Sequence, residues 1–301
     1  MTEIQGTGAS VSVVDVSRSF GAVAALDSVS FTVTPNTICG LLGSNGAGKT
    51  TLMALITGQD RPDAGQVHID GEAPFESTRI ARATSFIRDN QRYPDDYRLK
   101  HALGAAKLFH PKWDADFATA LAERFALPKT TDIRKFSRGQ LSALSIVLGL
   151  ASRAELTVFD EPYLGLDIAA RRRFYEILLE DYSSHPRTMI ISTHLVEEME
   201  EIFDQIVVLD KGRVRIDTTP DNLRNAAYEV SGRAEAVEQF VRGKEVISQR
   251  SVGSLASAMV MSGLADQELE QAHSLKLSVA PAPIHDLVAS IGSNYDNGGL
   301  A

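Results

Sequence analysis

The sequence of 301 residues lacks the features that mark disulfide-bonded, secreted or membrane-spanning chains. Its single cysteine, Cys39, excludes an intramolecular disulfide, and the apolar run at 38–42 around it indicates a small buried core residue rather than a nucleophile. No apolar run reaches the roughly 18 residues that a membrane-spanning helix needs. Residues 1–10 are polar, without the apolar core of a signal peptide. We therefore expect a cytoplasmic protein, which another protein must hold if it acts at a membrane.

Basic side chains are also in short supply, with 30 Lys and Arg against 39 Asp and Glu and a formal net charge of −9. A protein that binds nucleic acid regardless of sequence needs a basic surface to displace counterions from phosphates. We therefore expect no nucleic-acid partner and interpret the charge as a contribution to solubility. The hydrophobic fraction of 44% is ample for a sizeable core, and the length suits one large domain or one large and one small domain.

Alternating and continuous apolar runs predict short strands, and the continuous runs are typical of strands buried on both faces of a parallel sheet. The expected strands lie at residues 11–16, 29–33, 38–42, 67–69, 156–159, 189–191, 206–209 and 214–216. Residues 94–151 are rich in Ala and Leu at helical spacing, which predicts a helical insert.

A glycine-rich segment at residues 43–50, Gly-Ser-Asn-Gly-Ala-Gly-Lys-Thr, fits the phosphate-binding pattern of P-loop proteins. It lies between an expected strand and an expected helix at 50–57, so that backbone N–H groups and the positive end of the helix converge on phosphate oxygens. Lys49 would reach the β- and γ-phosphates, and Thr50 would hold Mg²⁺. The predicted nucleotide-binding residues are Gly43, Ser44, Asn45, Gly46, Ala47, Gly48, Lys49, Thr50 and Thr51.

Two acids, Asp160 and Glu161, follow the buried strand expected at 156–159. Ligands of parallel sheets bind at the carboxyl ends of the strands. Asp160 suits the Mg²⁺ shell, and Glu161 is placed to orient and polarise an attacking water, since phosphoryl transfer needs mainly positioning and charge stabilisation. Alone, the pair would equally suit the N-cap of a helix. Together with the P-loop, it indicates a nucleotide site, and the P-loop alone leaves kinases, GTPases and many motor proteins open.

The segment 136–140, Phe-Ser-Arg-Gly-Gln, lies shortly before this strand and resembles the LSGGQ signature of the ABC ATPase family. Other segments match the family in the same order. Gly-Leu-Asp at 165–167 is similar to its D-loop, Ser-Thr-His at 192–194 to its switch with a histidine, and Phe20 to its adenine-stacking aromatic. The resemblance covers about residues 11–223 of this chain.

The signature segment also makes physical sense by itself. Ser137 and Gln140 fit a capping box, which opens a helix with an apolar face and presents the helix N-terminus, a hydroxyl and a glycine backbone to an anion. The plainer interpretation of Ser137, ordinary capping of a surface helix, would stand if the other motifs were missing.

The resemblance implies an α/β fold: a P-loop NTPase core with a mixed sheet, an antiparallel β subdomain and an α-helical subdomain, plus a small C-terminal α+β domain. We expect the nucleotide-binding domain at residues 1–225, with its helical subdomain at about 94–151. We expect an accessory domain at 226–292 and a disordered tail at 293–301.

The resemblance further implies an ATPase that uses ATP and Mg²⁺ and works at the inner face of the cell membrane. Its implied partners are an integral membrane permease and a second ATP-binding subunit, in a homodimer or a heterodimer. Two cassettes would close head-to-tail around two ATP molecules. The implied catalytic residues are Lys49, Glu161 and His194, and the nucleotide contacts implied outside the P-loop are Phe20, Ser137, Gly139 and Gln140.

Two positions depart from the family pattern. Arg138 replaces the first glycine of the signature, where a long cation would aid phosphate binding, block close approach or point to solvent. In the Q-loop the best register places Asp89 in the role of a Mg²⁺ ligand, with Gln91 two residues later as the other candidate. The following residues 93–97 would line the groove that receives a coupling helix of the membrane subunit.

The segment 228–292 resembles small C-terminal extensions of single-cassette bacterial exporter ATPases, which favours export; a packing or dimerisation module is the plainer interpretation. Two other functions stay open. A soluble ABC ATPase of DNA repair or translation usually has coiled-coil or zinc insertions or two fused cassettes, and the sequence shows none of these. A nucleotide-gated switch with little turnover is suggested by Arg138 and the irregular Q-loop, and is opposed by the presence of Glu161.

Overall fold

A computed structural model describes residues 6–88, 91–193, 199, 201–263 and 266–293. The chain divides into two compact units, Met1–His194 with Ile202–Val214, and Leu195–Glu201 with Arg215–Ala301. The boundary that the sequence suggests between residues 225 and 226 stays a prediction. No helix in the described part of the chain is both long and apolar enough to cross a membrane.

The first unit is built on a six-stranded sheet with the order β5-β6-β7-β3-β8-β9. Its strands are β3 (Ile38–Leu42), β5 (Thr84–Ile87), β6 (Leu156–Asp160), β7 (Thr188–Thr193), β8 (Gln205–Asp210) and β9 (Arg213–Thr218), of which Arg213 and Val214 belong to this unit. The pairs β5–β6, β6–β7, β7–β3 and β3–β8 are parallel. Every residue of β3, β6 and β7 is buried, as expected of parallel strands that are covered on both faces.

A second, antiparallel sheet of three strands has the order β2-β1-β4. Its strands are β1 (Val11–Phe20), β2 (Val23–Val33) and β4 (Ala64–Ile69). Helix α1 (Lys49–Ile56) contributes Leu52 and Met53 to one apolar core that also holds Val13 of this sheet and Val158 of the parallel sheet. The two sheets are therefore held together through the helix that follows the P-loop.

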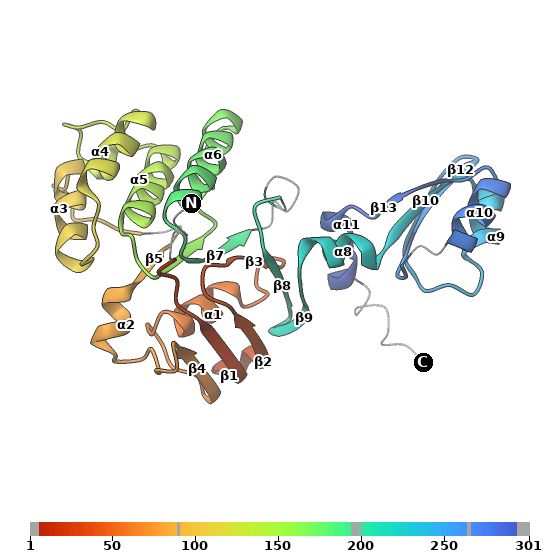
Figure 1. Ribbon diagram of the computed structural model, residues 1–301, viewed down its shortest axis with the longest axis horizontal. Coiled ribbons are helices and arrows are strands. Elements are labelled where there is room, and N and C mark those ends of the chain that lie inside the picture. The colour runs from red at the N-terminus through yellow and green to blue at the C-terminus, as the bar shows by residue number, and fades with distance from the viewer. Residues whose placement is uncertain (1–5, 89–90, 194–198, 200, 264–265, 294–301) are drawn as a thin grey trace, which may run out of the picture. The chain divides into compact units, whose positions relative to one another are not determined.

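The predicted helical insert at 94–151 is helical in the structure. The helices of the unit are α2 (Thr78–Ala83), α3 (Leu99–Phe109), α4 (Ala115–Arg124), the short η1 (Ile133–Lys135), α5 (Arg138–Ala151) and α6 (Ile168–Ser184). Helices α3, α4, α5 and α6 gather at one end of the unit, and the three-stranded sheet lies at the other end (Figure 1). Helix α4 packs its buried Ala118 and Leu121 toward α5, which is buried along most of its length.

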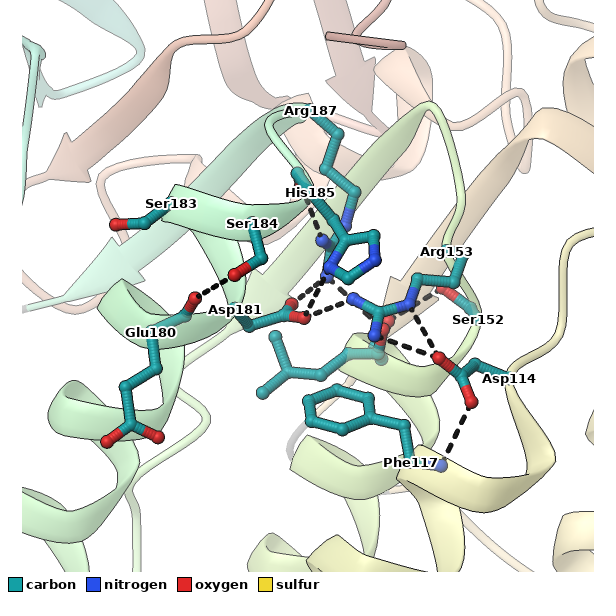
Figure 2. Close-up of polar contacts among 12 residues, drawn as sticks. Asp114, Phe117, Ser152, Arg153, Glu180, Asp181, Ser183, Ser184, His185 and Arg187 are labelled. Atoms are coloured by element: carbon teal, nitrogen blue, oxygen red, sulfur yellow. Dashed lines mark hydrogen bonds and ion pairs between the residues drawn. The ribbon is translucent and has the colours of Figure 1, made fainter. Parts of the chain in front are cut away.

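A buried ion cluster joins this helical region to the parallel sheet (Figure 2). Asp181 of α6 accepts hydrogen bonds from Arg187, at 2.8 Å, and from Arg153. Arg153 also donates to Asp114 at 2.9 Å, and Asp114 caps the N-terminus of α4 by accepting the N–H of Phe117 at 2.9 Å. Because Asp181 and Arg187 are 1% exposed, their charges depend on each other rather than on water.

The second unit contains its own antiparallel sheet with the order β11-β12-β10-β13. Its elements are α8 (Pro220–Ala226), β10 (Tyr228–Arg233), α9 (Ala234–Val241), β11 (Val246–Val252), β12 (Leu255–Val260), α10 (Asp266–Ser274), β13 (Ser278–Pro281) and α11 (Ile284–Ser293). The order from β10 to β13 is β-α-β-β-α-β, a split βαβ arrangement. A separate apolar core that includes Val230, Phe240 and Leu277 supports this sheet.

Candidate nucleotide-binding site

The P-loop connects β3 to α1, and its shape requires glycine at two positions. Gly43 has φ +149°, and a Cβ built on it would lie 2.2 Å from the carbonyl oxygen of Leu209. Gly48, the N-cap of α1, has φ +104°, and its Cβ would lie 2.5 Å from the carbonyl oxygen of Ala25. Both the left-handed backbone and the close approach exclude a side chain. The loop can therefore turn its backbone toward a ligand at the helix N-terminus.

The side chain of Lys49 lies within this loop. Its Nζ donates hydrogen bonds to the carbonyl oxygens of Gly43, at 2.7 Å, and Ser44, at 3.1 Å. Nζ also lies 3.9 Å from Oε1 of Glu161. Burial lowers the pKa of the Lys49 ammonium, while the carboxylates of Glu161 and Asp160 act in the opposite direction. A cation held among carbonyls and near two acids is placed to neutralise bound phosphate.

A cleft of about 270 Å³ brings six of the nine predicted P-loop residues together with both acids. It is lined by residues 23–25 and by Asn45, Gly46, Gly48, Lys49, Thr50, Thr51, Asp160 and Glu161. The other three predicted P-loop residues do not line the cleft and instead make contacts that hold the loop in place. Gly43 and Ser44 accept from Lys49, and Ala47 is buried, with its carbonyl accepting the N–H of Gly212 at 3.0 Å.

Asp160 is fixed by hydroxyl groups from two other elements. Thr50 donates to its Oδ2 at 2.9 Å, and Ser192 donates to its Oδ1 at 2.7 Å. Ser192 can reach it because the parallel register of β6 and β7 pairs these two residues. In the sequence, Ser192 is apparent only as the first residue of the Ser-Thr-His motif at 192–194. The available signal was a hydroxyl residue at the end of a second buried strand, but the strand order that places it beside Asp160 comes from the fold.

Glu161 lies at the same sheet end in a strained backbone conformation, with φ +50°. Its N–H donates to Ser192 Oγ at 2.9 Å, and its Oε2 lies 2.5 Å from the hydroxyl oxygen of Tyr163. Tyr163 is buried and was not among the predicted site residues. Its signal in the sequence was weak, because an aromatic residue after a strand most often packs in a core.

The signature segment forms the predicted capping box at the start of α5. Ser137 Oγ accepts the N–H of Gln140 at 3.2 Å, and Gln140 Oε1 accepts the N–H of Ser137 at 2.9 Å. A Cβ on Gly139 would lie 2.7 Å from the carbonyl oxygen of Gly165, so the first turn of α5 packs closely on the D-loop segment. Ser137 and Arg138 are exposed, and this helix end does not line the P-loop cleft.

The roles of all predicted site residues stay predictions, and three of these residues do not line the P-loop cleft in the described structure or cannot be placed in it. Asp89 and His194 lie outside the described residues. Phe20 ends β1 and is 53% exposed, with the guanidinium of Arg18 4.9 Å from its ring centroid. It pairs with Val23, which lines the cleft, although Phe20 itself does not. Its proposed stacking on adenine stays a prediction.

Fold and site together define a P-loop nucleotide-binding cassette, and comparisons with known proteins make the class specific. The family model described as ABC transporter matches residues 26–164. The chain is 30% identical over 215 residues to the Nod factor export ATP-binding protein I of Rhizobium etli, covering 69% of this chain and 68% of that protein. It is 31% identical over 209 residues to the aliphatic sulfonates import ATP-binding protein SsuB 1 of Nocardia farcinica, covering 69% and 81%.

Among solved structures, one described as the structure of the ATP-binding subunit of an ABC transporter matches with a TM-score of 0.65 and 27% identity. That match covers 71% of this chain and 91% of the solved chain. The chain belongs to the ABC transporter family as an ATP-binding subunit, and it is an ATPase. The resemblance found in the sequence is thereby confirmed, as is the α/β P-loop fold class.

Proposed function

We propose that this ATPase drives export through a separate membrane permease, at the inner face of the membrane, by ATP-dependent closure of a dimer. The observation that carries the proposal is the separation of two half-sites on one chain. Lys49 and both acids line one cleft, whereas the capped, exposed helix end at Ser137 lies outside it. A second copy can supply the missing helix end to a phosphate that the first chain holds. One complete set of motifs permits a homodimer.

Within each half-site, Thr50 and Asp160 would hold Mg²⁺. Their oxygens lie 2.9 Å apart, and a hydroxyl with a carboxylate is the kind of oxygen donor set that Mg²⁺ takes. The described residues contain no cluster of three or more acid, histidine or cysteine side chains that could hold a metal by themselves. This agrees with an ion that arrives with the nucleotide, because Mg²⁺ usually combines one or two protein ligands with substrate phosphates.

The remaining roles follow from charge and position. Lys49 would neutralise the β- and γ-phosphates, and the positive end of α1 would add to that field. Glu161 would accept a hydrogen bond from the attacking water and orient it toward the γ-phosphate. The capped helix end of a second copy of this chain, with its Ser137, Gly139 and Gln140, would contact the nucleotide from the side opposite the P-loop. His194, which lies outside the described residues, would contact the γ-phosphate by resemblance to the family.

A groove of about 540 Å³ offers a docking place for the permease. Tyr93, Pro94 and Tyr97 line it, together with Ala105 and Phe109 of α3. Phe109 is 70% exposed, so its ring is available for contact with a partner. We infer that a short helix of the permease enters here with its apolar face.

Export as the direction rests on the small C-terminal unit and its resemblance to extensions of exporter ATPases. The names of the relatives do not decide the direction, since one is an export protein and another an import protein. A comparison of small molecules in the culture medium of wild-type and Lys49→Ala cells would decide it. Export predicts that a compound disappears from the medium of the variant, whereas import predicts that a compound accumulates there.

The proposal of a permease partner is tested by co-expression with a candidate membrane permease. The tagged chain should sediment with membranes, and Phe109→Glu should reduce that capture about tenfold or more, because a charge enters the groove. Leu108→Glu is the matched control: Leu108 is 81% exposed on the same helix but does not line the groove. A wild-type chain that stays in the supernatant would favour a soluble ABC ATPase instead.

A further inference from the structure

A tyrosine with no role in the motifs touches the residue proposed to orient the attacking water. The hydroxyl oxygen of Tyr163 lies 2.5 Å from Oε2 of Glu161 and 2.5 Å from Oγ1 of Thr193. Tyr163 is 2% exposed and Thr193 is fully buried, so water does not replace these contacts. The three side chains form one buried chain of hydrogen bonds between the end of β6 and the end of β7.

The direction of these bonds follows from the number of available protons. An ionised carboxylate only accepts hydrogen bonds, and a tyrosine hydroxyl has one proton to give. Tyr163 therefore donates to Glu161, which leaves the hydroxyl of Thr193 to donate to the oxygen of Tyr163. A phenylalanine would fill the same space without a polar group to satisfy. The buried hydroxyl thus requires these partners, and one of them is the proposed catalytic carboxylate.

Glu161 is held from several sides, and Tyr163 supplies the contact to its Oε2. The backbone of Glu161 has φ +50°, and its N–H is fixed by Ser192. On the side chain, Oε1 lies 3.9 Å from the Nζ of Lys49, while Oε2 accepts from Tyr163. The hydrogen bond from Tyr163 therefore fixes the carboxylate at Oε2, while the contact of Oε1 with Lys49 is a longer ion pair. A carboxylate that must orient one water benefits from such a fixed position.

Consecutive residues of β7 serve the two acids of the site in different ways. Ser192 bonds Asp160 directly, because the two residues are register partners. Successive side chains of a strand point to opposite faces of the sheet, so Thr193 faces away from the side that Ser192 uses. Tyr163, from the segment after β6, bridges the distance between Thr193 and Glu161. The end of β7 thereby supports both acids.

We propose that Tyr163 is a positioning residue for ATP hydrolysis, and that its hydroxyl, anchored by Thr193, holds the carboxylate of Glu161 in the orientation that directs the attacking water. This inference rests on the proposed role of Glu161, and the experiment separates the two. Tyr163 acts through Glu161 and does not contact the nucleotide cleft, so its loss affects turnover rather than nucleotide binding.

The test is steady-state phosphate release by the full chain with Tyr163→Phe, which keeps the ring and removes one oxygen atom. We expect kcat to fall about tenfold while the KM for ATP changes less than about twofold, as for a group that acts only in the transition state. Thr193→Val should lower kcat in the same direction, by about threefold, since it removes only the anchor. A merely structural role would change KM and the midpoint of thermal unfolding together with kcat.

Tyr182→Phe provides the matched control. The hydroxyl of Tyr182 donates to the backbone carbonyl of Asn36, away from the nucleotide cleft, so its removal also costs one hydrogen bond but should leave kcat unchanged. In a Glu161→Gln background, Tyr163→Phe should lower the residual turnover no further, because the two residues act as one unit.

Two different results would each overturn a different claim, one about Glu161 and one about Tyr163. If Glu161→Gln turns over ATP normally, the proposed role of Glu161 is wrong. If Glu161→Gln is inactive while Tyr163→Phe keeps kcat within about twofold of the wild type, only the inference about Tyr163 is wrong. Should Tyr163→Phe fail to fold, Thr193→Val decides alone: an unchanged kcat overturns the inference.

Discussion

Thr50 Oγ1 donates a hydrogen bond of 2.9 Å to Asp160 Oδ2 across 110 positions of sequence, joining the first turn of α1 to the carboxyl end of β6. The P-loop pattern and the acid-tipped strand together predict one magnesium nucleotide site from the sequence. Their side chains meet in the structure. These two oxygen atoms are the ligands that we propose for Mg²⁺. Contacts with the ion would then replace the hydrogen bond between them when Mg-nucleotide binds.

We predict that Asp160→Asn weakens the binding of Mg²⁺ but leaves the fold stable. The amide keeps the shape of the carboxylate but loses its charge, so the Mg²⁺ concentration for half-maximal phosphate release should rise about tenfold or more. Titration of Mg²⁺ at saturating ATP measures this value. An unchanged midpoint in the variant would mean that Asp160 does not hold the ion.

Two helix glycines should respond in opposite directions to alanine. A Cβ on Gly149 of α5 would lie 2.5 Å from Phe159 Cε1 and 3.0 Å from Ile87 Cγ1, so Gly149→Ala should cost about 1–3 kcal/mol through overpacking. Gly104 of α3 has no neighbouring atom within 4 Å, so Gly104→Ala should add about 0.5–1 kcal/mol through helix propensity. Urea unfolding compares both. A stabilised Gly149→Ala would contradict the tight packing of α5 on β6.

The cluster of Figure 2 predicts a large cost for removing its acid. Asp181→Asn would leave Arg153 and Arg187 side by side without a negative charge between them, at a cost of about 3–5 kcal/mol. Asp221→Asn is the matched control. Asp221 pairs with Arg224 at 3.0 Å but is 86% exposed, so the change should stay below about 0.5 kcal/mol. Equal effects of both substitutions on urea unfolding would show that the buried cluster does not stabilise the fold.

Asp114 predicts a pH dependence of stability. Partial burial by itself would raise its pKa, but the hydrogen bond from Phe117 and the guanidinium of Arg153 outweigh burial and lower the pKa from 3.8. Because the pKa is lower in the folded state, the ionised carboxylate stabilises the fold above pH 3.8, and this contribution is lost as the pH falls through the folded-state pKa.

Asp114→Asn removes the charge and keeps a good N-cap. We expect the variant to be less stable than the wild type by about 1 kcal/mol near neutral pH, with the difference shrinking as the pH falls below 3.8. Urea unfolding of both proteins over this pH range measures the difference. If the difference in stability between the two proteins stays constant down to the lowest pH, it arises from packing rather than from the charge of Asp114.

Local patterns were sufficient to predict much of the fold and part of the site. The glycines at 43 and 48 indicate a loop that only glycine can form, and the apolar run of β3 predicts a strand buried on both faces. The capping box of Ser137 and Gln140 could be predicted because all its atoms come from four consecutive residues. Signals of this kind need no knowledge of which strands lie side by side.

Contacts that depend on strand order could not be predicted in this way. Ser192 supports Asp160 only because β7 lies next to β6, and Tyr163 reaches Thr193 only through the same adjacency. The pairing of Asp181 with Arg153 joins α6 to the segment between α5 and β6. A single sequence carries no local pattern for such partners, since their separation in the chain is set by the topology.

In the proposed dimer, two half-sites from two chains bind one nucleotide between them. The molecular mass of the Glu161→Gln protein in solution, measured with and without Mg-ATP, tests this arrangement. We predict a single chain of 32.6 kDa without nucleotide and twice that mass with ATP. Adding Ser137→Asp, which keeps the N-cap but sets a carboxylate against the γ-phosphate, should leave ATP bound and the protein monomeric. A Glu161→Gln protein that stays monomeric with ATP bound, or a double variant that dimerises equally well, would contradict the composite site.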